Sequence, residues 1–300
     1  MHYYSLNGNY GRTNNALIEV AKALRYITQA EQPAALVLES AFASVLLPYD
    51  YVTAFKSWAC VLMTVPAGVD FKELNAKQMY WSHSETEADD DFISAVLHQV
   101  MLRPLPLLRE RVEAFEREQL VGPGQFNAVH LRWLEGNCID WLSADQLGYL
   151  GVGQLECQDV PEATAEDVCS MSNAYLDAAL RHTPGLPLFL ADDGQQPNRT
   201  DVLVSERSAK RVPADVAEGQ GLEMDMLLLI RSSHFVGNPA SSLTLNVARV
   251  RSFHFGGNPA SNLKVKCLAI NAEEQLVNRL PRLEPQLTSR HNAVDHLIHY

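Results

Sequence analysis

Short apolar segments alternate with amphipathic segments along most of the chain, and this alternation constrains the fold more than any other feature. The first apolar segment, HYYSLN at residues 2–7, precedes ALIEVAKALRYI, in which Leu17, Ala21 and Leu24 recur at helical spacing. Alternating strands and helices are typical of a sheet whose strands run parallel. The sequence therefore predicts an α/β fold with parallel sheets.

The same pattern continues to about residue 251. Further strands are expected in AALVLES (34–40), WACVLMTVP (58–66), FNAVHLRWLEGNC (126–138), LPLFLADDG (186–194) and HFVG (234–237). Helices are expected over 93–120 with interruptions at Pro104 and Pro106, over 161–182, in MDMLLLIRSS (224–233) capped by Asp225, and in SLTLNVARVR (242–251). The acidic stretch HSETEADDD at 83–91 predicts a solvated loop.

The chain is long enough for two domains. The stretch VGPGQ at 121–125 is rich in turn-forming residues and predicts the boundary between them. We expect an N-terminal Rossmann-like domain at residues 1–122, a C-terminal Rossmann-like domain at 123–270 and a tail at 271–300.

Charge, cysteine content and hydropathy exclude several classes of protein. With 24 Lys and Arg against 36 Asp and Glu, the net charge is −12, which argues against nucleic acid or an anionic membrane as the main partner. Five cysteines without a CxxC pair argue against a zinc site and leave disulfide pairing open. The N-terminal MHYYSLNGNYGR lacks the pattern of a signal peptide, and no uncharged apolar run is long enough to span a membrane.

Four polar loops follow expected strands. They are NGNYGRTNN (7–15), HLRWLEGNC (130–138), ADDG (191–194) and GNPASS (237–242). Each alone is compatible with a solvated turn. Because ligands of open parallel sheets bind beyond the carboxyl ends of the strands, the four together favour one shared ligand cleft.

The loop GNPASS has the features of an anion site. Gly237 allows the backbone to bend after the strand, Pro239 fixes the turn, and Ser241 or Ser242 is placed to cap the following helix. The free N–H groups and the dipole of that helix would suit a phosphate. A plain capped turn is the alternative.

The loops after the other two C-terminal strands carry charged side chains. Arg132 is suited to hold a phosphate through two parallel hydrogen bonds, with a surface ion pair to Glu135 as the alternative. His130 is a candidate general base without a visible partner. Asp192 and Asp193 would accept bonds from a nucleobase or ribose, with a helix cap or turn as the alternative.

One phrase occurs twice, as HFVGNPASSL at 234–243 and as HFGGNPASNL at 254–263. The first copy precedes a segment with helical spacing, whereas the second precedes LKVKCLAI, which alternates like a strand. Only the first copy places a helix N-terminus behind its serines. We therefore assign the phosphate role to residues 237–243, and interpret the second copy as a duplication with a structural role or none.

In combination these segments resemble the GDP-fucose protein O-fucosyltransferase family. GNYGRTNNALIEVAKAL resembles the family's first loop and helix, VHLRWLEG its His-x-Arg motif, and LFLADDG its strand with an Asp-rich turn. DMLLLIRSSHFVGNPASSLTLNVARVR resembles the family's final motif, and it is the most specific of the four. Together the four pieces extend from residue 3 to about residue 251.

The resemblance implies a GT-B fold, with two Rossmann-like domains whose parallel sheets face a cleft and the donor mostly on the second. It also implies transfer of fucose from GDP-fucose to a protein or glycan hydroxyl, with inversion and without a metal or other cofactor. The family acts in the Golgi or ER lumen. The first loop departs from the family pattern, since Asn14 stands in place of the usual Gly. This favours, as an alternative, a degenerate GT-B protein that binds a nucleotide or glycan without turnover.

Site residues follow from the resemblance and from the loops. As catalytic residues we expect Arg132 at the diphosphate, Asn15 near the reacting centre and Glu135 as the base. The residues expected to bind the donor lie in the first loop, the His-x-Arg motif, the Asp-rich turn and the final turn: Gly11, Arg12, Asn14, His130, Asp192, Asp193, Gly237, Ser241, Ser242 and Leu243.

Overall fold

The computed structural model contains two parallel sheets. It describes residues 2–8, 13–29, 33–38, 42, 45–55, 60–62, 68–81, 87–133, 138–139, 165–181, 185–217, 220–238 and 241–254. The second copy of the repeated phrase, which begins at His254, lies almost entirely outside these ranges, as do Gly11, Arg12 and Glu135. Within the described residues no helix is long and apolar enough to cross a membrane.

The first sheet has the strand order β3-β2-β1-β4, and every pairing in it is parallel. Its strands are β1 (His2–Asn7), β2 (Ala34–Leu38), β3 (Cys60–Leu62) and β4 (Phe71–Asn75). The helices of this half are α1 (Thr13–Thr28), α3 (Tyr51–Phe55), α4 (Ala76–Trp81) and α5 (Glu87–Met101). The apolar periodicity predicted β1, α1, β2 and β3, whereas β4, α3 and α4 were not predicted.

The second sheet has the order β6-β5-β7 and is also parallel. Its strands are β5 (Asn127–Leu131), β6 (Leu188–Asp192) and β7 (His234–Gly237). The helices of this half are α6 (Pro106–Gln119), α8 (Ala165–Ser170), α9 (Asn173–Leu180), α10 (Pro197–Arg207), α11 (Ala214–Ala217), α12 (Gly221–Arg231) and α13 (Ser242–His254). The helix predicted to follow HFVG is therefore confirmed.

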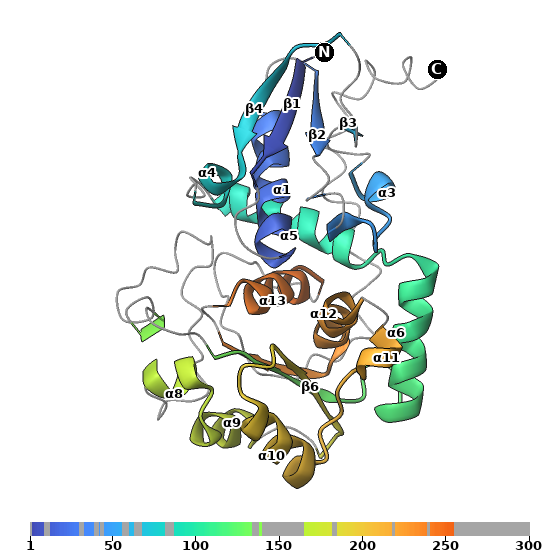
Figure 1. Ribbon diagram of the computed structural model, residues 1–300, viewed down its shortest axis with the longest axis vertical. Coiled ribbons are helices and arrows are strands. Elements are labelled where there is room, and N and C mark those ends of the chain that lie inside the picture. The colour runs from blue at the N-terminus through green and yellow to red at the C-terminus, as the bar shows by residue number, and fades with distance from the viewer. Residues whose placement is uncertain are drawn as a thin grey trace.

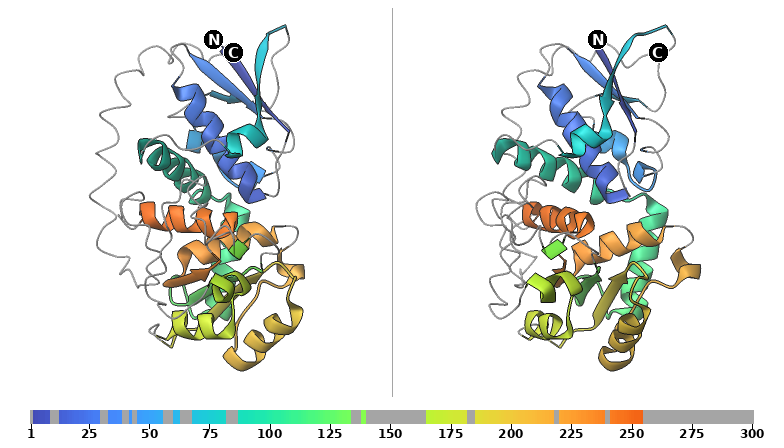
Figure 2. Two further views of the ribbon diagram at one scale, coloured as in Figure 1. Left: turned by 90° about the vertical axis from the view of Figure 1, so that its left-hand side faces the viewer. Right: turned by 60° about the vertical axis from the view of Figure 1, so that its left-hand side comes forward.

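Helices α12 and α13 lie between the two sheets (Figures 1 and 2). Side chains alternate along β5, so that Ala128 joins the core beneath α12 and α13 while Val129 joins a second core beneath α9 and α10. The first of these cores also contains Leu6 and Leu36 of the first sheet. Since α13 packs on both α5 and α12, the two halves share one continuous apolar core.

Three predictions about local structure were wrong. The helix expected over 161–182 is broken, because Met171 has a positive φ of 51° and the Ser172 hydroxyl then caps α9 by accepting from the Tyr175 N–H at 3.1 Å. Asp225 lies inside α12, whose N-cap is Gln220. The acidic stretch is helical from Glu87 onward. In contrast, the interruption at Pro104 and Pro106 is confirmed, since α5 ends at Met101 and α6 begins at Pro106.

Candidate functional site

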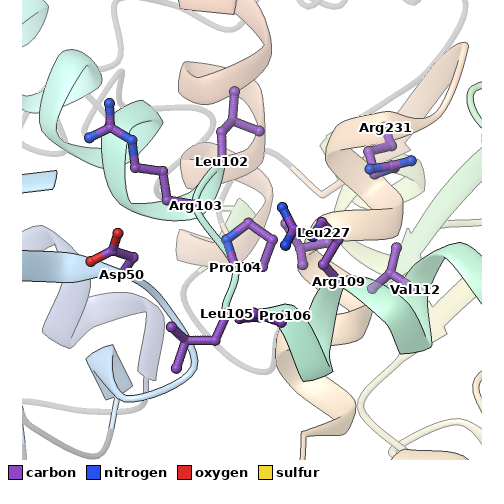
Figure 3. A pocket seen from close by; sticks show the side chains of 10 residues that line it. All are labelled: Asp50, Leu102, Arg103, Pro104, Leu105, Pro106, Arg109, Val112, Leu227 and Arg231. Carbon is purple, nitrogen blue, oxygen red and sulfur yellow. The ribbon is translucent and has the colours of Figure 1, made fainter. Parts of the chain in front are cut away.

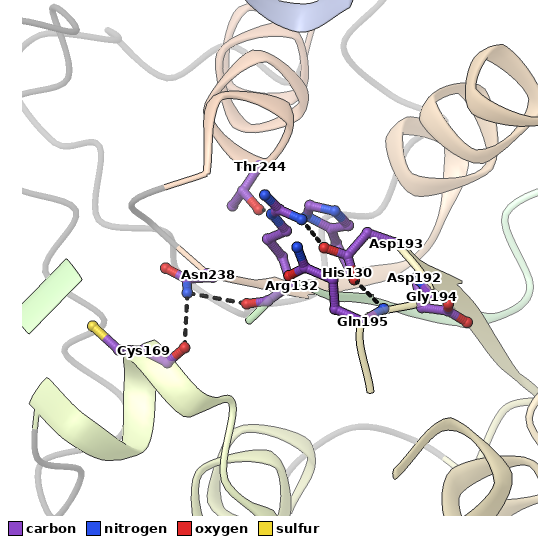
Figure 4. Close-up of polar contacts among 9 residues, drawn as sticks. All are labelled: His130, Arg132, Cys169, Asp192, Asp193, Gly194, Gln195, Asn238 and Thr244. Atoms are coloured by element: carbon purple, nitrogen blue, oxygen red, sulfur yellow. Dashed lines mark hydrogen bonds and ion pairs between the residues drawn. The ribbon is translucent and has the colours of Figure 1, made fainter. Parts of the chain in front are cut away.

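The carboxyl ends of the three C-terminal strands meet at one edge of the second sheet. Leu131 of β5 is in register with Asp192 of β6, and His130 is in register with Gly237 of β7. The polar residues that follow these strands therefore gather in one place, as Figure 4 shows for the side chains of Arg132, Asp193 and Asn238. Three of the four predicted polar loops thus adjoin, at the edge where parallel sheets bind ligands.

The guanidinium of Arg132 forms an ion pair with Asp193, in which Nη1 donates to Oδ2. Both side chains are partly accessible, with 21% and 14% of their surfaces exposed. The other carboxylate oxygen of Asp193 accepts from the Gln195 N–H at 3.1 Å. Arg132 therefore already has an anionic partner, although the partner that the sequence suggested was Glu135.

The neighbouring Asp192 has different contacts. Its Oδ1 accepts from the Gly194 N–H at 2.7 Å, and its Oδ2 lies 2.8 Å from Nε of Arg211. Only 3% of its side chain is exposed. The two carboxylates of the ADDG loop are thus divided between Arg132 and Arg211, and both also cap the turn.

His130 is buried against the first turn of α13. Its Nδ1 lies 2.9 Å from the Thr244 hydroxyl, with which it shares a hydrogen bond. Burial and the nearby positive charge of Arg132 lower the pKa of His130 to about 3. A histidine with this pKa is neutral at physiological pH and is poorly suited to act as a general base.

Gly237 permits the close approach of α13 to β7. A Cβ atom added at this position would lie 2.6 Å from the Thr244 hydroxyl oxygen and 2.9 Å from Cζ of Phe235. The φ of Gly237 is not positive. The glycine is therefore required for space, and not for the backbone bend that the sequence suggested.

Helix α13 begins directly behind the edge of the site. Ser241 stands just before the helix, with its carbonyl accepting from the Leu245 N–H at 3.0 Å, and Ser242 is the first helical residue. Ser241 and Leu243 are buried, whereas Ser242 is partly exposed. The N–H groups of the first turn have no acceptors within the helix, so this end of α13 is suited to an anion.

The start of α1 contacts the same helix from the first sheet. The Asn246 side chain donates to the Asn14 carbonyl at 3.0 Å and to its Oδ1 at 3.3 Å. Asn246 is only two residues from Thr244, so one turn of α13 contacts both His130 and the beginning of α1. Asn15 is the partly buried neighbour of Asn14. Helix α13 thus contacts both Asn14 and the edge of the second sheet. Asn14 and Asn15, which the sequence placed in the first loop, belong to the first turn of α1.

Asn238 has contacts in the site that the sequence analysis did not anticipate. It follows β7, has no exposed surface, and donates from Nδ2 to the carbonyls of Arg132 at 3.1 Å and of Cys169 at 3.2 Å (Figure 4). Cys169 of α8 forms a disulfide with Cys138. The only signal for this residue was its place in the GNPASS loop, which specifies no contact.

A pocket of about 420 Å³ lies elsewhere, at the junction of α5 and α6 (Figure 3). Apolar residues and prolines line most of it, together with Asp50, Arg103, Arg109 and Arg231. Arg231 is bound to Glu116 through two hydrogen bonds of 2.8 Å. Because the pocket includes none of the predicted site residues, it is not the predicted ligand site. Among the described residues, no three His, Cys, Asp or Glu side chains gather as a metal site would require.

Comparison with solved structures agrees with this architecture. POFUT1 in its apo form superposes with a TM-score of 0.55 at 14% identity, over 84% of this chain and 95% of that one. The chain has the fold of POFUT1. A crystal structure of POFUT1 in complex with GDP-fucose matches over the same shares, at 14% identity and with a TM-score of 0.52. A second POFUT1 complex with GDP-fucose gives a TM-score of 0.54 at 13% identity, over 84% of this chain and 94% of that one.

The likeness to POFUT1 confirms the predicted GT-B-like fold of two parallel α/β units and, at the level of fold, the predicted resemblance. No protein-family model and no curated protein matches the chain.

Proposed function

We propose that the protein is a fucosyltransferase that moves fucose from GDP-fucose to a hydroxyl of a protein or glycan. The observation that carries the proposal is the position of Arg132 in a protein with the POFUT1 fold. It directly follows β5 and lies near His130, whose ring contacts Thr244 in the first turn of α13. POFUT1 has been crystallised with GDP-fucose. A positive side chain and a helix N-terminus at one strand edge suit a diphosphate.

The chemistry assigns a role to each group. The acceptor oxygen attacks the anomeric carbon as the bond from that carbon to the phosphate oxygen breaks, and attack from the opposite face inverts the centre. GDP leaves with increased negative charge, which Arg132 and the N–H groups of α13 would stabilise, an effect often worth several kcal/mol. Glu135 would take the proton of the acceptor, and Asn15 would lie near the reacting centre. The proposed mechanism uses no metal, because Arg132 would supply positive charge to the leaving diphosphate.

The remaining donor residues divide between direct and indirect roles. Gly11, Arg12 and Asn14 of the first loop would approach the donor from the first sheet. Asp192 is the proposed carboxylate near guanine, while Asp193 would act through its ion pair with Arg132. The other donor-site residues, His130, Gly237, Ser241, Ser242 and Leu243, would shape the phosphate site at the start of α13.

We further propose that the protein acts in the lumen of the secretory pathway. The Cys138–Cys169 disulfide supports an oxidising compartment, because disulfides are rare where glutathione keeps thiols reduced.

One observation favours the rival function, a nucleotide- or glycan-binding protein without turnover. Asn14, which stands in place of the family's usual Gly, is 5% exposed, and both its oxygens accept bonds from Asn246. A residue of the first loop is thereby used for contact between the two halves of the chain.

A turnover assay separates the two functions. Incubation with GDP-fucose, with and without hydroxyl acceptors, should release GDP, and EDTA should leave the rate unchanged. GDP-mannose and UDP-sugars serve as controls for donor identity. Binding of GDP without turnover would favour the rival, and turnover that EDTA abolishes and manganese restores would contradict the metal-independent mechanism.

A further inference from the structure

Asn238 extends the contact between β5 and β7 beyond the end of the strand pairing. The ladder ends with His130 opposite Gly237. Two residues after His130, and just beyond the end of β5, the Arg132 carbonyl accepts from Asn238 Nδ2 at 3.1 Å. The side-chain amide thus provides a bond to a backbone segment that the sheet itself no longer holds.

The same amide joins this segment to α8. Its second acceptor is the Cys169 carbonyl at 3.2 Å, and Cys169 is linked by a disulfide to Cys138, six residues after Arg132. The amide has no exposed surface; its bond to Cys169 is buried and its bond to Arg132 is partly buried. Removing it would leave the carbonyls of Cys169 and Arg132 without this donor, which is costly for the buried bond to Cys169.

Arg132 is therefore held at two points. Asn238 fixes its backbone, and Asp193 pairs with its guanidinium. Asn238 has no charge and, being fully buried, is not placed to touch a ligand itself. Its direct effect is on the position of Arg132.

We infer that Asn238 is a positioning residue, which aims the Arg132 guanidinium at the diphosphate of the donor. This inference rests on the proposed function. An aspartate at the position would direct a carboxylate at two carbonyl oxygens, and a leucine would offer no donor. The inference also gives the Asn of the GNPASS loop a role distinct from that of its serines.

The test compares two ligands that differ only in the diphosphate. Calorimetry with GDP and with guanosine is carried out on the parent protein and on Asn238→Ala. GDP affinity should fall about tenfold, a change of about 1.4 kcal/mol, while guanosine affinity stays within about twofold. Equal losses for the two ligands would show a general structural role and overturn the inference.

A double-mutant cycle with Arg132→Ala isolates the coupling between the two residues. If Asn238 acts through Arg132, Asn238→Ala should change GDP affinity less than about twofold once Arg132 is absent. Additive losses would overturn the positioning role alone. Unchanged GDP affinity in Arg132→Ala would overturn the proposed donor site and this inference with it.

Asn127 provides the matched control. It is a buried asparagine at the opposite end of β5, where its Oδ1 lies 3.0 Å from Nδ1 of His234 on β7. Asn127→Ala should lower the melting temperature but leave the ratio of GDP to guanosine affinity unchanged; a changed ratio would overturn the inference.

A second variant is used if Asn238→Ala does not fold. Asn238→Ser retains one donor and replaces Asn238→Ala in the same cycle. It should show a smaller decrease in the ratio of GDP to guanosine affinity. An equal loss for both ligands in Asn238→Ser would again overturn the inference.

Discussion

The guanidinium of Arg132 and the carboxylate of Asp193 form an ion pair across the ends of the adjacent strands β5 and β6. A diphosphate bound at Arg132 would therefore meet a negative charge already in contact with the same guanidinium. The pair holds Arg132 in place, but it also opposes an anionic ligand. Holding Arg132 requires a hydrogen-bond acceptor, whereas opposing the ligand requires the negative charge. A substitution that removes the charge but keeps an acceptor separates the two effects.

Asp193→Asn should strengthen GDP binding by about threefold to tenfold. The amide keeps one oxygen, which can accept from Arg132 or from the Gln195 N–H but not from both, while the charge that repels phosphate is removed. Titration calorimetry at low and at physiological salt measures the effect, which should shrink as salt screens it. Weaker GDP binding would show that the charge itself is needed, as a contact to guanine or as a base.

Gly237→Ala should destabilise the protein by about 1–3 kcal/mol, because the added methyl group collides with Thr244 at the start of α13. Gly185→Ala is the matched control, since its added Cβ would meet nothing within 4 Å. Chemical denaturation of both variants gives the comparison. Equal stability of the two would contradict the close packing of α13 on β7.

Ser242→Leu should weaken GDP binding by about 1–2 kcal/mol, because a bulky side chain at the first helical residue would obstruct the N–H groups offered to phosphate. The equivalent change in the second copy of the phrase, Asn262→Leu, should leave GDP affinity within error. Thermal melts confirm folding of both variants. The reverse result would place the nucleotide on the second copy.

Asp225→Asn should stabilise the protein, and more so at high pH. Burial, and next the carboxylate of Asp192, raise the pKa of Asp225 to about 8, so the folded protein keeps a proton that the unfolded chain releases above about pH 4. The stability contributed by this group is full below pH 4 and is lost as the pH rises toward 8. We expect a gain of about 1–3 kcal/mol at pH 7.5 and little gain at pH 4.5. Urea denaturation at both values measures it, and an equal gain at both would contradict the shifted pKa.

The sequence predicted every described strand except β4, because burial on a parallel sheet leaves apolar runs, of which the β2 segment AALVL is an example. It predicted α1, α12 and α13 as helices but not α10. It also predicted that the HLR, ADDG and GNPASS loops would adjoin, since parallel strands end at one edge. It did not predict the break at Met171, which depends on a single backbone angle. Nor did it predict the partner of Arg132, because Asp193 is distant in sequence and becomes a neighbour only through strand register.

The contacts of Asn238 and Gly237 were outside the reach of the sequence for the same reason. The amide of Asn238 joins residues 69 and 106 positions away, and the need for glycine at 237 arises from a side chain on the next helix. Local patterns report periodicity and turn chemistry, whereas such contacts depend on how close two elements approach.

The GDP affinity of Arg132→Ala tests the proposed donor site most directly. We expect a loss of about 1.5–3 kcal/mol in a protein that still folds, because a charge-assisted contact to the diphosphate is removed. Arg207→Ala is the control, since it breaks an arginine–aspartate pair with Asp177 on the outer helices of the same half, and it should leave GDP affinity unchanged. Unchanged GDP affinity in a folded Arg132→Ala protein would contradict the proposed donor site at the end of β5.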